Sequence, residues 1–138
     1  MNKKKTITVA LAIITNDQND ILVVRKKDGL YFALPGGKIE ATETANEALI
    51  RELNEELNLS FNTTDFTFLA NHTTKAANEV NTMVEGHIFL LNKNLTQTVS
   101  GYAEIEEVLW LSKANHMNYR LAHLFTEFAL PKWLSETL

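Results

Sequence analysis

Three glutamates, Glu52, Glu55 and Glu56, fall within five residues of each other, in the segment RELNEELNL that begins at Arg51. Each residue of an α-helix turns about 100° around the axis, so the three carboxylates would share one arc of roughly 100°. Like charges at such spacings destabilise a helix by about 0.2–0.5 kcal/mol per pair. Mg²⁺ prefers oxygen ligands and commonly binds carboxylates, water and a substrate phosphate together. The pattern therefore indicates a cation site, with an ordinary solvated face of Glu47–Arg51 and Arg51–Glu55 pairs as the alternative.

Two neighbouring features favour the cation site. The small residues Ala45 and Ala48 lie on the acidic arc, which we interpret as room for a metal and a substrate to approach. The Pro35–Gly37 loop precedes the helix, and its glycines allow a close approach of the backbone. A carbonyl of this loop could join the carboxylates around a cation.

The run GKIEATETANEALIRELNEELNL, from Gly37 to Leu59, resembles the Nudix box of the MutT/Nudix hydrolases. That motif is G-x5-E-x7-R-E-U-x-E-E-x-G-U, where U is a bulky aliphatic residue. Asn58 stands where the family has glycine, and because this position ends the helix, no catalytic group is lost. The residues in register are Gly37, Glu43, Arg51, Glu52, Leu53, Glu55, Glu56 and Leu59.

The resemblance implies hydrolysis of a nucleoside diphosphate linked to another group X, with Mg²⁺ or Mn²⁺ as the cofactor. It assigns roles to six positions: metal ligands Glu52, Glu55, Glu56 and the Gly36 carbonyl, with Arg51 and Glu43 as a supporting pair. Such phosphoryl transfer depends mainly on positioning and charge neutralisation, so no protein nucleophile is needed.

Further candidates lie outside the box. Many relatives place an acidic residue in a loop before the last strand, as a metal ligand or general base. In YAEIEEVLW the first choice for this role is Glu104 and the second is Glu107, with surface charge as the alternative. The candidate substrate contacts are Arg25, Lys26 and Lys38 for phosphates, Tyr31 or Phe32 for stacking on a base, and Asn118 for a base edge. Solvated charge, core packing and helix capping are the respective alternatives for these substrate candidates.

These residues must be positioned by strands and two helices. Thr44 and Glu47 form a capping-box pattern, which predicts a helix over 45–57 that ends at Asn58 in the left-handed conformation. A second helix is predicted from about 117 to Pro131. The predicted strands are 6–15, its hairpin partner 21–27, 65–73, 81–91 and 106–112. This order predicts an α+β protein, and the resemblance implies the α/β/α sandwich of the Nudix fold, with a central mixed sheet.

Composition limits the other possibilities. The chain has 138 residues, which predicts a single domain over 1–138, and its net charge of −4 leaves no basic field for a long nucleic acid. No apolar run approaches the roughly 20 residues that span a bilayer, and the apolar start is a better strand than a signal peptide. With no cysteine, the sequence fits the reducing cytoplasm.

The predicted function is therefore a divalent-metal-dependent nucleoside triphosphate pyrophosphohydrolase. Its substrates would include oxidised nucleotides such as 8-oxo-dGTP, and its products a nucleoside monophosphate and pyrophosphate. An ADP-ribose or nucleotide-sugar pyrophosphatase and a noncatalytic nucleotide sensor are the alternatives. Neither the substrate nor the oligomeric state, for which a homodimer is one option, follows from the sequence.

Overall fold

Two helical layers and two small sheets make up the fold. The computed structural model describes residues 5–77 and 79–138. The strands are β1 (Lys5–Ile13), β2 (Ile21–Lys26), β3 (Gly36–Lys38), β4 (Phe66–Lys75), β5 (Thr82–Leu91) and β6 (Ile105–Leu111). The helices are α1 (Ala45–Leu57) and α2 (Leu130–Leu134), with short helical turns η1 (Thr63–Asp65), η2 (His116–Asn118) and η3 (Phe125–Ala129). In this part of the chain, no helix has the length and apolar character needed to cross a membrane.

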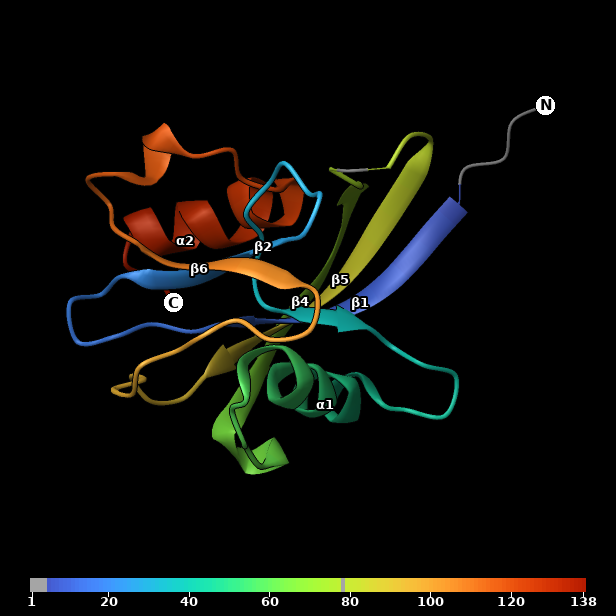
Figure 1. Cartoon of the computed structure of the whole chain (residues 1–138), viewed down its shortest axis with the longest axis horizontal. Coiled ribbons are helices and arrows are strands. Elements are labelled where there is room, and N and C mark those ends of the chain that lie inside the picture. The colour runs from blue at the N-terminus through green and yellow to red at the C-terminus, as the bar shows by residue number, and fades with distance from the viewer. Residues whose placement is uncertain (1–4, 78) are drawn as a thin grey trace.

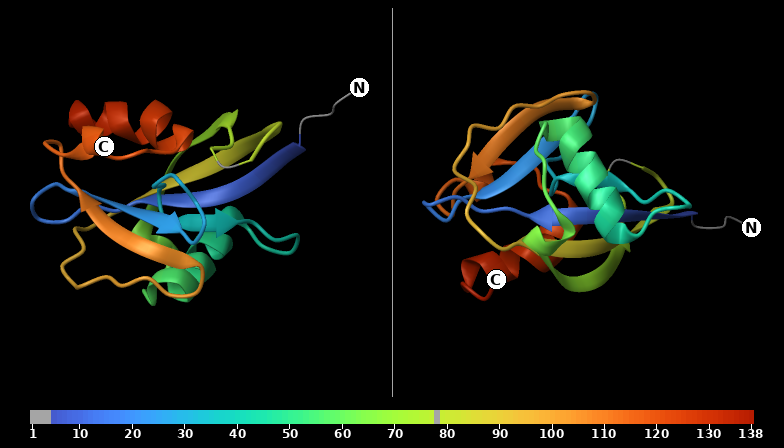
Figure 2. Two further views of the ribbon diagram at one scale, coloured as in Figure 1. Left: turned by 45° about the horizontal axis from the view of Figure 1, so that its top comes forward. Right: turned by 90° about the horizontal axis from the view of Figure 1, so that it is seen from below.

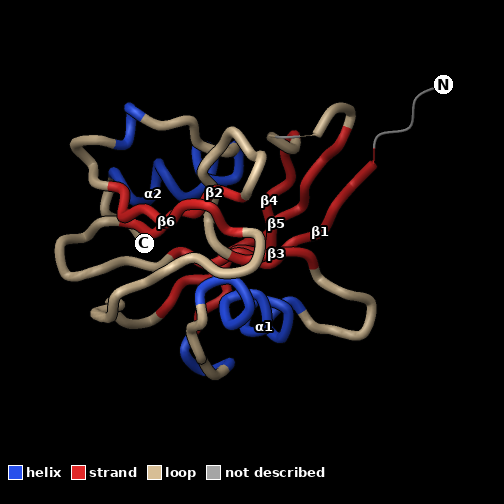
Figure 3. Tube along the Cα trace, in the orientation of Figure 1, coloured by secondary structure: helices blue, strands red, loops and turns tan. Residues whose placement is uncertain are grey.

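The strands lie between the two helical layers. Within the described residues they form a four-stranded sheet in the order β3-β1-β5-β4 and a two-stranded sheet of β2 and β6. Since β1 pairs parallel to β5 and antiparallel to β3, the larger sheet is mixed. Helix α1 lies on one side of the strands and α2 on the other (Figure 1), and the strands separate the two helical layers (Figure 3). The predicted α/β/α arrangement is confirmed.

The second half of strand β1, from Ala10 to Ile13, is buried on both faces. Ala10 and Ala12 belong to the hydrophobic core beneath α1, whereas Leu11 and Ile13 belong to the core beneath the C-terminal helix. A strand covered on both sides needs apolar residues at successive positions. This explains why its sequence is a continuous apolar run rather than an alternating one.

The predicted hairpin between the first two strands is wrong. Strand β2 pairs along its length with β6, while its contact with the end of β1 is limited to the Thr15–Ile21 bridge and one Leu22 N–H to Ile14 carbonyl hydrogen bond. Both edges of β1 are already occupied by β3 and β5. The turn after β1 therefore carries the chain from one sheet to the other (Figure 2).

The predicted C-terminal helix is also corrected at both ends. Helical residues run from 123 to 134, and Pro131 lies inside this stretch instead of ending it. The preceding residues, Phe125–Ala129, form a π-helical turn, in which the Leu130 N–H donates to the Phe125 carbonyl. Pro131 then stands in the first turn of the α-helical segment that follows, where a missing N–H is tolerated.

Helix α1 has the predicted bounds. The Thr44 side chain accepts a hydrogen bond from the Glu47 N–H, and the Glu47 side chain accepts one from the Thr44 N–H. Asn58 ends the helix in the left-handed conformation, with φ 55° and ψ 36°. Leu49, Leu53 and their neighbours on the same face are buried against the strands. This packing fixes the rotation of α1 and so directs its acidic face toward β3.

Candidate active site

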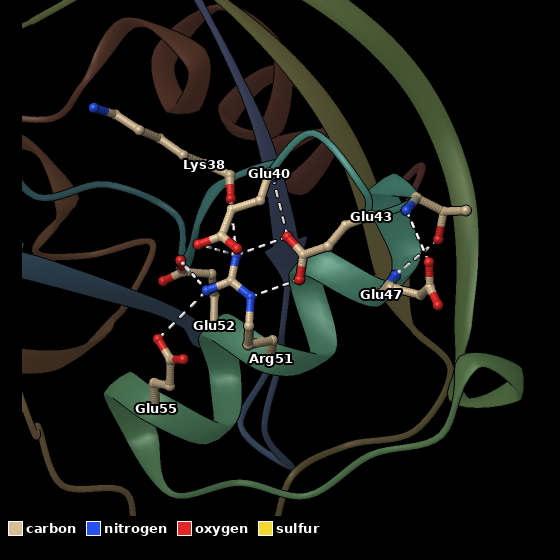
Figure 4. A network of polar contacts seen from close by, with 8 residues as sticks. Lys38, Glu40, Glu43, Glu47, Arg51, Glu52 and Glu55 are labelled. Carbon is tan, nitrogen blue, oxygen red and sulfur yellow. Dashed lines mark hydrogen bonds and ion pairs between the residues drawn. The ribbon is translucent and has the colours of Figure 1, made fainter.

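Arg51 lies at the centre of an acidic network on α1 (Figure 4). Its Nε donates to Glu43 Oε2 at 2.6 Å and its Nη2 to Glu43 Oε1 at 2.8 Å, so the guanidinium holds this carboxylate at both oxygens. Its Nη1 donates to Glu52 at 2.9 Å and to Glu55 at 3.4 Å. Nη2 also donates to the Lys38 carbonyl at 3.1 Å, which ties the helix to β3.

The network keeps Glu43 and Arg51 charged. The hydrogen bonds from Arg51 lower the pKa of Glu43 to about 2. The Glu43 carboxylate in turn raises the pKa of Arg51 above its ordinary value. The predicted pairing of these two residues is present, and it leaves Arg51 in place to orient Glu52 and Glu55.

Glu56, on the same helix, is buried, with 6% of its surface exposed. Burial raises the pKa of Glu56 to about 7, although the positive charge of Lys26 acts in the opposite direction. The carboxylates of Glu52, Glu104 and Glu55 raise its pKa further. Glu56 therefore marks a place where additional positive charge would stabilise the ionised protein.

The donor atoms around Glu56 suit a hard divalent cation, because carboxylate and carbonyl oxygens are the ligands preferred by Mg²⁺ and Mn²⁺. Among the described residues, no three acidic or histidine side chains already converge as a metal site. Glu52 and Glu55 instead contact Arg51. The residues thus fit a cation by charge and chemistry, and these two carboxylates would exchange Arg51 for it.

Two glycines let the loop fit against this face. Gly36 has φ +140°, and a Cβ there would lie 2.0 Å from the Ala10 carbonyl oxygen. A Cβ on Gly37 would lie 2.5 Å from the carboxyl carbon of Glu52. Glycine at 36 lets the backbone pass close to β1, and glycine at 37 leaves room for the end of the Glu52 side chain.

The interpretation of Ala45 and Ala48 as open space for a metal is wrong. Ala48 is fully buried, and Ala45 packs against the same hydrophobic core. The face of α1 that packs on the strands therefore includes Ala45 and Ala48 as well as Leu49 and Leu53. Space beside Glu52 comes from Gly37 instead.

A cavity of about 460 Å³ adjoins the glycine loop. Its apolar wall includes Val9 and Leu11 of β1 and Leu124 from the C-terminal helix. Gly36 and Gly37 line the end of the cavity next to α1. The polar and charged side chains that line it are Lys26, Lys27, Asp28, Tyr31, Lys38, Lys75, Glu79 and His123.

Three of the predicted substrate contacts line this cavity: Lys26, Lys38 and Tyr31. Phe32 does not line it, and its predicted role in stacking is corrected. Phe32 is buried and packs edge-to-face on Tyr119, with ring centroids 5.5 Å apart. Successive residues of an extended chain point to opposite sides, which separates Tyr31 from Phe32.

The other two predicted contacts, Arg25 and Asn118, also lie outside the cavity lining. Arg25 is held by the Glu107 carboxylate and donates to the Gly29 carbonyl at 3.0 Å. Asn118 is exposed at the end of η2. Neither residue is placed to contact a molecule in the cavity.

The two candidate bases have different surroundings. The Glu104 carboxylate lies 3.9 Å from the Lys26 ammonium, and the Glu104 carbonyl accepts a hydrogen bond from the Lys27 N–H at 2.9 Å. The neighbouring Tyr102 N–H donates to the Glu56 carbonyl at 2.8 Å. These bonds place Glu104 on the Glu56 side of the site, whereas Glu107 pairs with Arg25.

Several cavity residues were missed from the sequence. The loop segments 28–34 and 74–80 contribute to the lining, although residue 78 lies outside the described residues. His123 and Lys75 line the cavity as well, but no motif distinguishes them in the sequence. The loop 94–105 lies outside the lining. Only the packing of the C-terminal helix against β4 could have identified His123.

Comparison with known proteins agrees with the sequence and the fold. The family model described as the NUDIX domain matches residues 4–128. The 8-oxo-dGTP diphosphatase of Escherichia coli K12 is 38% identical over 60 residues, which are 41% of this chain and 46% of that protein. The ADP-ribose pyrophosphatase of Methanocaldococcus jannaschii is 43% identical over 54 residues, or 37% of this chain and 32% of that protein. The chain thus matches under half the length of either relative.

Solved structures share the fold over the whole chain. The MutT protein from Methanosarcina mazei Go1 has a TM-score of 0.73 at 19% identity, covering 99% of this chain and 98% of that one. A bifunctional NMN adenylyltransferase/ADP ribose pyrophosphatase from Francisella tularensis, complexed with AMP and a Mn ion, has a TM-score of 0.72 at 22% identity. It covers 100% of this chain and 44% of that one. At identities of 19% and 22%, this similarity is evidence of a shared fold alone.

Proposed function

The chain belongs to the Nudix family, and from that premise we propose that it is a Mg²⁺- or Mn²⁺-dependent hydrolase of nucleoside diphosphates linked to a group X. One observation carries the proposal: the cavity and the acidic network meet at the glycine loop. Gly36 and Gly37 line the cavity, and Gly37 packs against Glu52. A phosphate chain lying in the cavity would therefore reach the carboxylates of α1.

Each group at this junction has a distinct task. Arg51 holds Glu52 and Glu55 on this face until a cation replaces it, and Glu56 adds a carboxylate whose charge is costly unless a cation is near. A divalent cation at such a site polarises the phosphate bridge and lowers the pKa of bound water. Glu104, on the same side, is the candidate to accept the proton that the attacking water loses.

The cavity suits a single nucleotide. Its volume of about 460 Å³ lies within the range of roughly 300–1,000 Å³ that is typical of small-molecule sites. We infer that Lys26 and Lys38 neutralise phosphates and that Tyr31 contacts the base. A nucleoside triphosphate, including an oxidised one, is the leading substrate, and cleavage would yield a nucleoside monophosphate and pyrophosphate.

A second candidate substrate is ADP-ribose or another nucleotide sugar. The specific observation that favours it is the similarity to the M. jannaschii ADP-ribose pyrophosphatase, at 43% identity over 54 residues. The two candidates differ in product. Triphosphate cleavage releases pyrophosphate, whereas ADP-ribose cleavage yields two monophosphates.

A substrate panel tests the proposal directly. Nucleoside triphosphates, 8-oxo-dGTP, ADP-ribose and nucleotide sugars are incubated with and without Mg²⁺ or Mn²⁺, and products are resolved by ion-exchange chromatography. We expect metal-dependent cleavage of at least one compound. Metal-independent binding of a nucleotide with no cleavage of any compound would identify a noncatalytic sensor instead.

The identity of the base is tested by a matched pair of variants. We expect Glu104→Gln to lower kcat by about 100-fold, within the usual contribution of a general base. Glu107→Gln should keep kcat within about twofold, since exposed ion pairs contribute little. Steady-state kinetics on the best substrate of the panel distinguishes them, and a larger loss in Glu107→Gln would reverse the assignment.

A further inference from the structure

The far end of the cavity is walled by two segments distant in sequence. One wall is Lys75–Ala77, at the end of β4, and the other is Ala122–Phe125, at the start of the C-terminal helix. These walls belong to separate elements, so the width between them depends on how the helix is fastened to β4. The contacts between the C-terminal helix and β4 lie next to the cavity and are separate from the acidic network on α1.

Glu127 bridges the two elements. One of its oxygens, Oε1, lies 2.8 Å from His72 Nε2, and the other, Oε2, accepts a hydrogen bond from Thr74 Oγ1 at 2.7 Å. His123 Nδ1 lies 3.0 Å from the Lys75 carbonyl oxygen on the same seam. These residues, which we call the wall seam, connect three positions of β4 to two positions of the helix.

The charge of Glu127 agrees with this bridging position. Hydrogen bonds from His72 and Thr74 lower the pKa of Glu127, and the His123 ring adds a smaller effect of the same sign. The carboxylate therefore stays ionised and accepts from both donors. Hydrogen bonds to an ionised acceptor are stronger than neutral ones.

An apolar contact shows that the helix lies close to the sheet beside the seam. Gly86 pairs with His72 in the β4–β5 register, and a Cβ on Gly86 would lie 2.8 Å from Leu124 Cδ1. Leu124 is buried and also lines the cavity. The buried leucine holds the helix at one point, while the wall seam fixes its angle over the end of β4.

We propose that Glu127 is a positioning residue that fixes the distance between the two far walls of the cavity and thereby determines how tightly the substrate moiety held there is bound. This rests on the proposed function, in which the cavity receives the substrate. Glu127 lies outside the cavity lining, so it acts through His123 and Leu124 rather than by touching the ligand. Its loss should weaken substrate binding and leave the acidic network on α1 intact.

The kinetic test separates binding from chemistry. We expect Glu127→Ala to raise KM about five- to tenfold, as for the loss of about one kcal/mol in binding, with kcat unchanged within about twofold. Glu127→Gln, which keeps an acceptor for Thr74, should restore part of the affinity. The matched control is Glu136→Gln, which removes another exposed carboxylate that pairs with Lys113, and neither residue of this pair lines the cavity. Equal KM values in all three variants and the wild type would overturn the proposal.

Hydrogen exchange supplies a readout that does not need turnover. Amides of 122–126, whose bonds include Ala122 N–H to the Phe32 carbonyl, should exchange faster in Glu127→Ala than in the wild type or Glu136→Gln. Unchanged exchange would show that Glu127 does not fasten the wall, whatever the enzyme hydrolyses. Faster exchange in a protein that cleaves no compound of the panel would support the fastening and reject the proposed function.

Discussion

Two carboxylate sites of different construction lie beside the cavity, one next to the glycine loop and the other behind the walls formed by Lys75–Ala77 and Ala122–Phe125. Next to α1, Arg51 binds acidic partners and a carbonyl no more than 13 positions away along the chain. At the far end, Glu127 binds residues 55 and 53 positions away, through a histidine and a threonine. The first cluster concentrates charge where phosphate chemistry would occur, and the second joins two elements. Changes near α1 should therefore act on kcat, and changes at the far end on KM.

The largest expected effect is that of Glu56→Gln. We expect kcat to fall about 1,000-fold, as for other groups that organise charge at a reacting centre. Because glutamine is neutral and similar in size, the variant should be more stable at pH 8 without metal, by on the order of 2 kcal/mol. Steady-state kinetics and urea unfolding measure the two effects. A wild-type kcat in the Glu56→Gln variant would show that Glu56 is not an active-site residue.

The two loop glycines offer the next contrast. Gly36→Ala should lower the free energy of unfolding by roughly 2–4 kcal/mol, because φ is positive and the new Cβ meets backbone that cannot move. Gly37→Ala displaces only the end of the Glu52 side chain, so it should lose activity with a smaller loss of stability. Thermal unfolding and kcat of the two variants give this comparison. Equal destabilisation would show that Glu52 cannot move aside.

A pH series tests whether the buried carboxylate of Glu56 destabilises the protein when no cation is bound. Since the folded-state pKa of Glu56 is raised to about 7, the native state binds more protons than the unfolded state between its ordinary pKa, near 4.5, and 7. Stability without metal should therefore fall as pH rises through this window, by on the order of 2 kcal/mol. Urea unfolding in EDTA measures the fall, and Mg²⁺ should reduce it. The Glu56→Gln variant, which lacks the titrating group, should show a flatter profile.

The smallest of these effects is expected for Arg51→Lys. An ammonium cannot reach Glu43 at two oxygens while also holding Glu52, so we expect kcat to fall about tenfold. The pKa of Glu43 should rise from about 2 toward its ordinary value, because its hydrogen bonds with Arg51 are the main cause of its low value. NMR titration of the glutamate carboxyl carbons measures this change. An unchanged pKa of Glu43 would mean that its backbone hydrogen bond at Glu40, and not Arg51, keeps this pKa low.

Sequence reasoning worked best where contacts are local. The capping box at Thr44, the bounds of α1 and the left-handed Asn58 follow from neighbouring residues, and all three are present. The Arg51–Glu43 pair, which the structure contains, was implied by the resemblance of this segment to the Nudix box. The fold class was also predicted, because helical and extended patterns are properties of short segments.

Predictions that needed distant partners were wrong or missing. Strand β2 was assigned to β1, but its partner is β6, whose paired residues lie 79 to 90 positions away along the chain. Phe32 was predicted to stack on a base and Ala48 to leave room for a metal, but both residues are buried in the core. Periodicity shows that a side chain is apolar or small, but does not show which surface will cover it.

By itself, the sequence determined the acidic face of α1, the glycine loop before it and the Nudix membership that both support, because these depend on residues within one short segment. Tertiary structure alone decided that Glu56 is buried, that the glycine loop borders a cavity, and that Glu127 reaches His72 and Thr74. Burial and long-range pairing arise from the packing of whole elements on one another. That packing minimises exposed apolar surface over the entire chain, and no local spacing of residues encodes it.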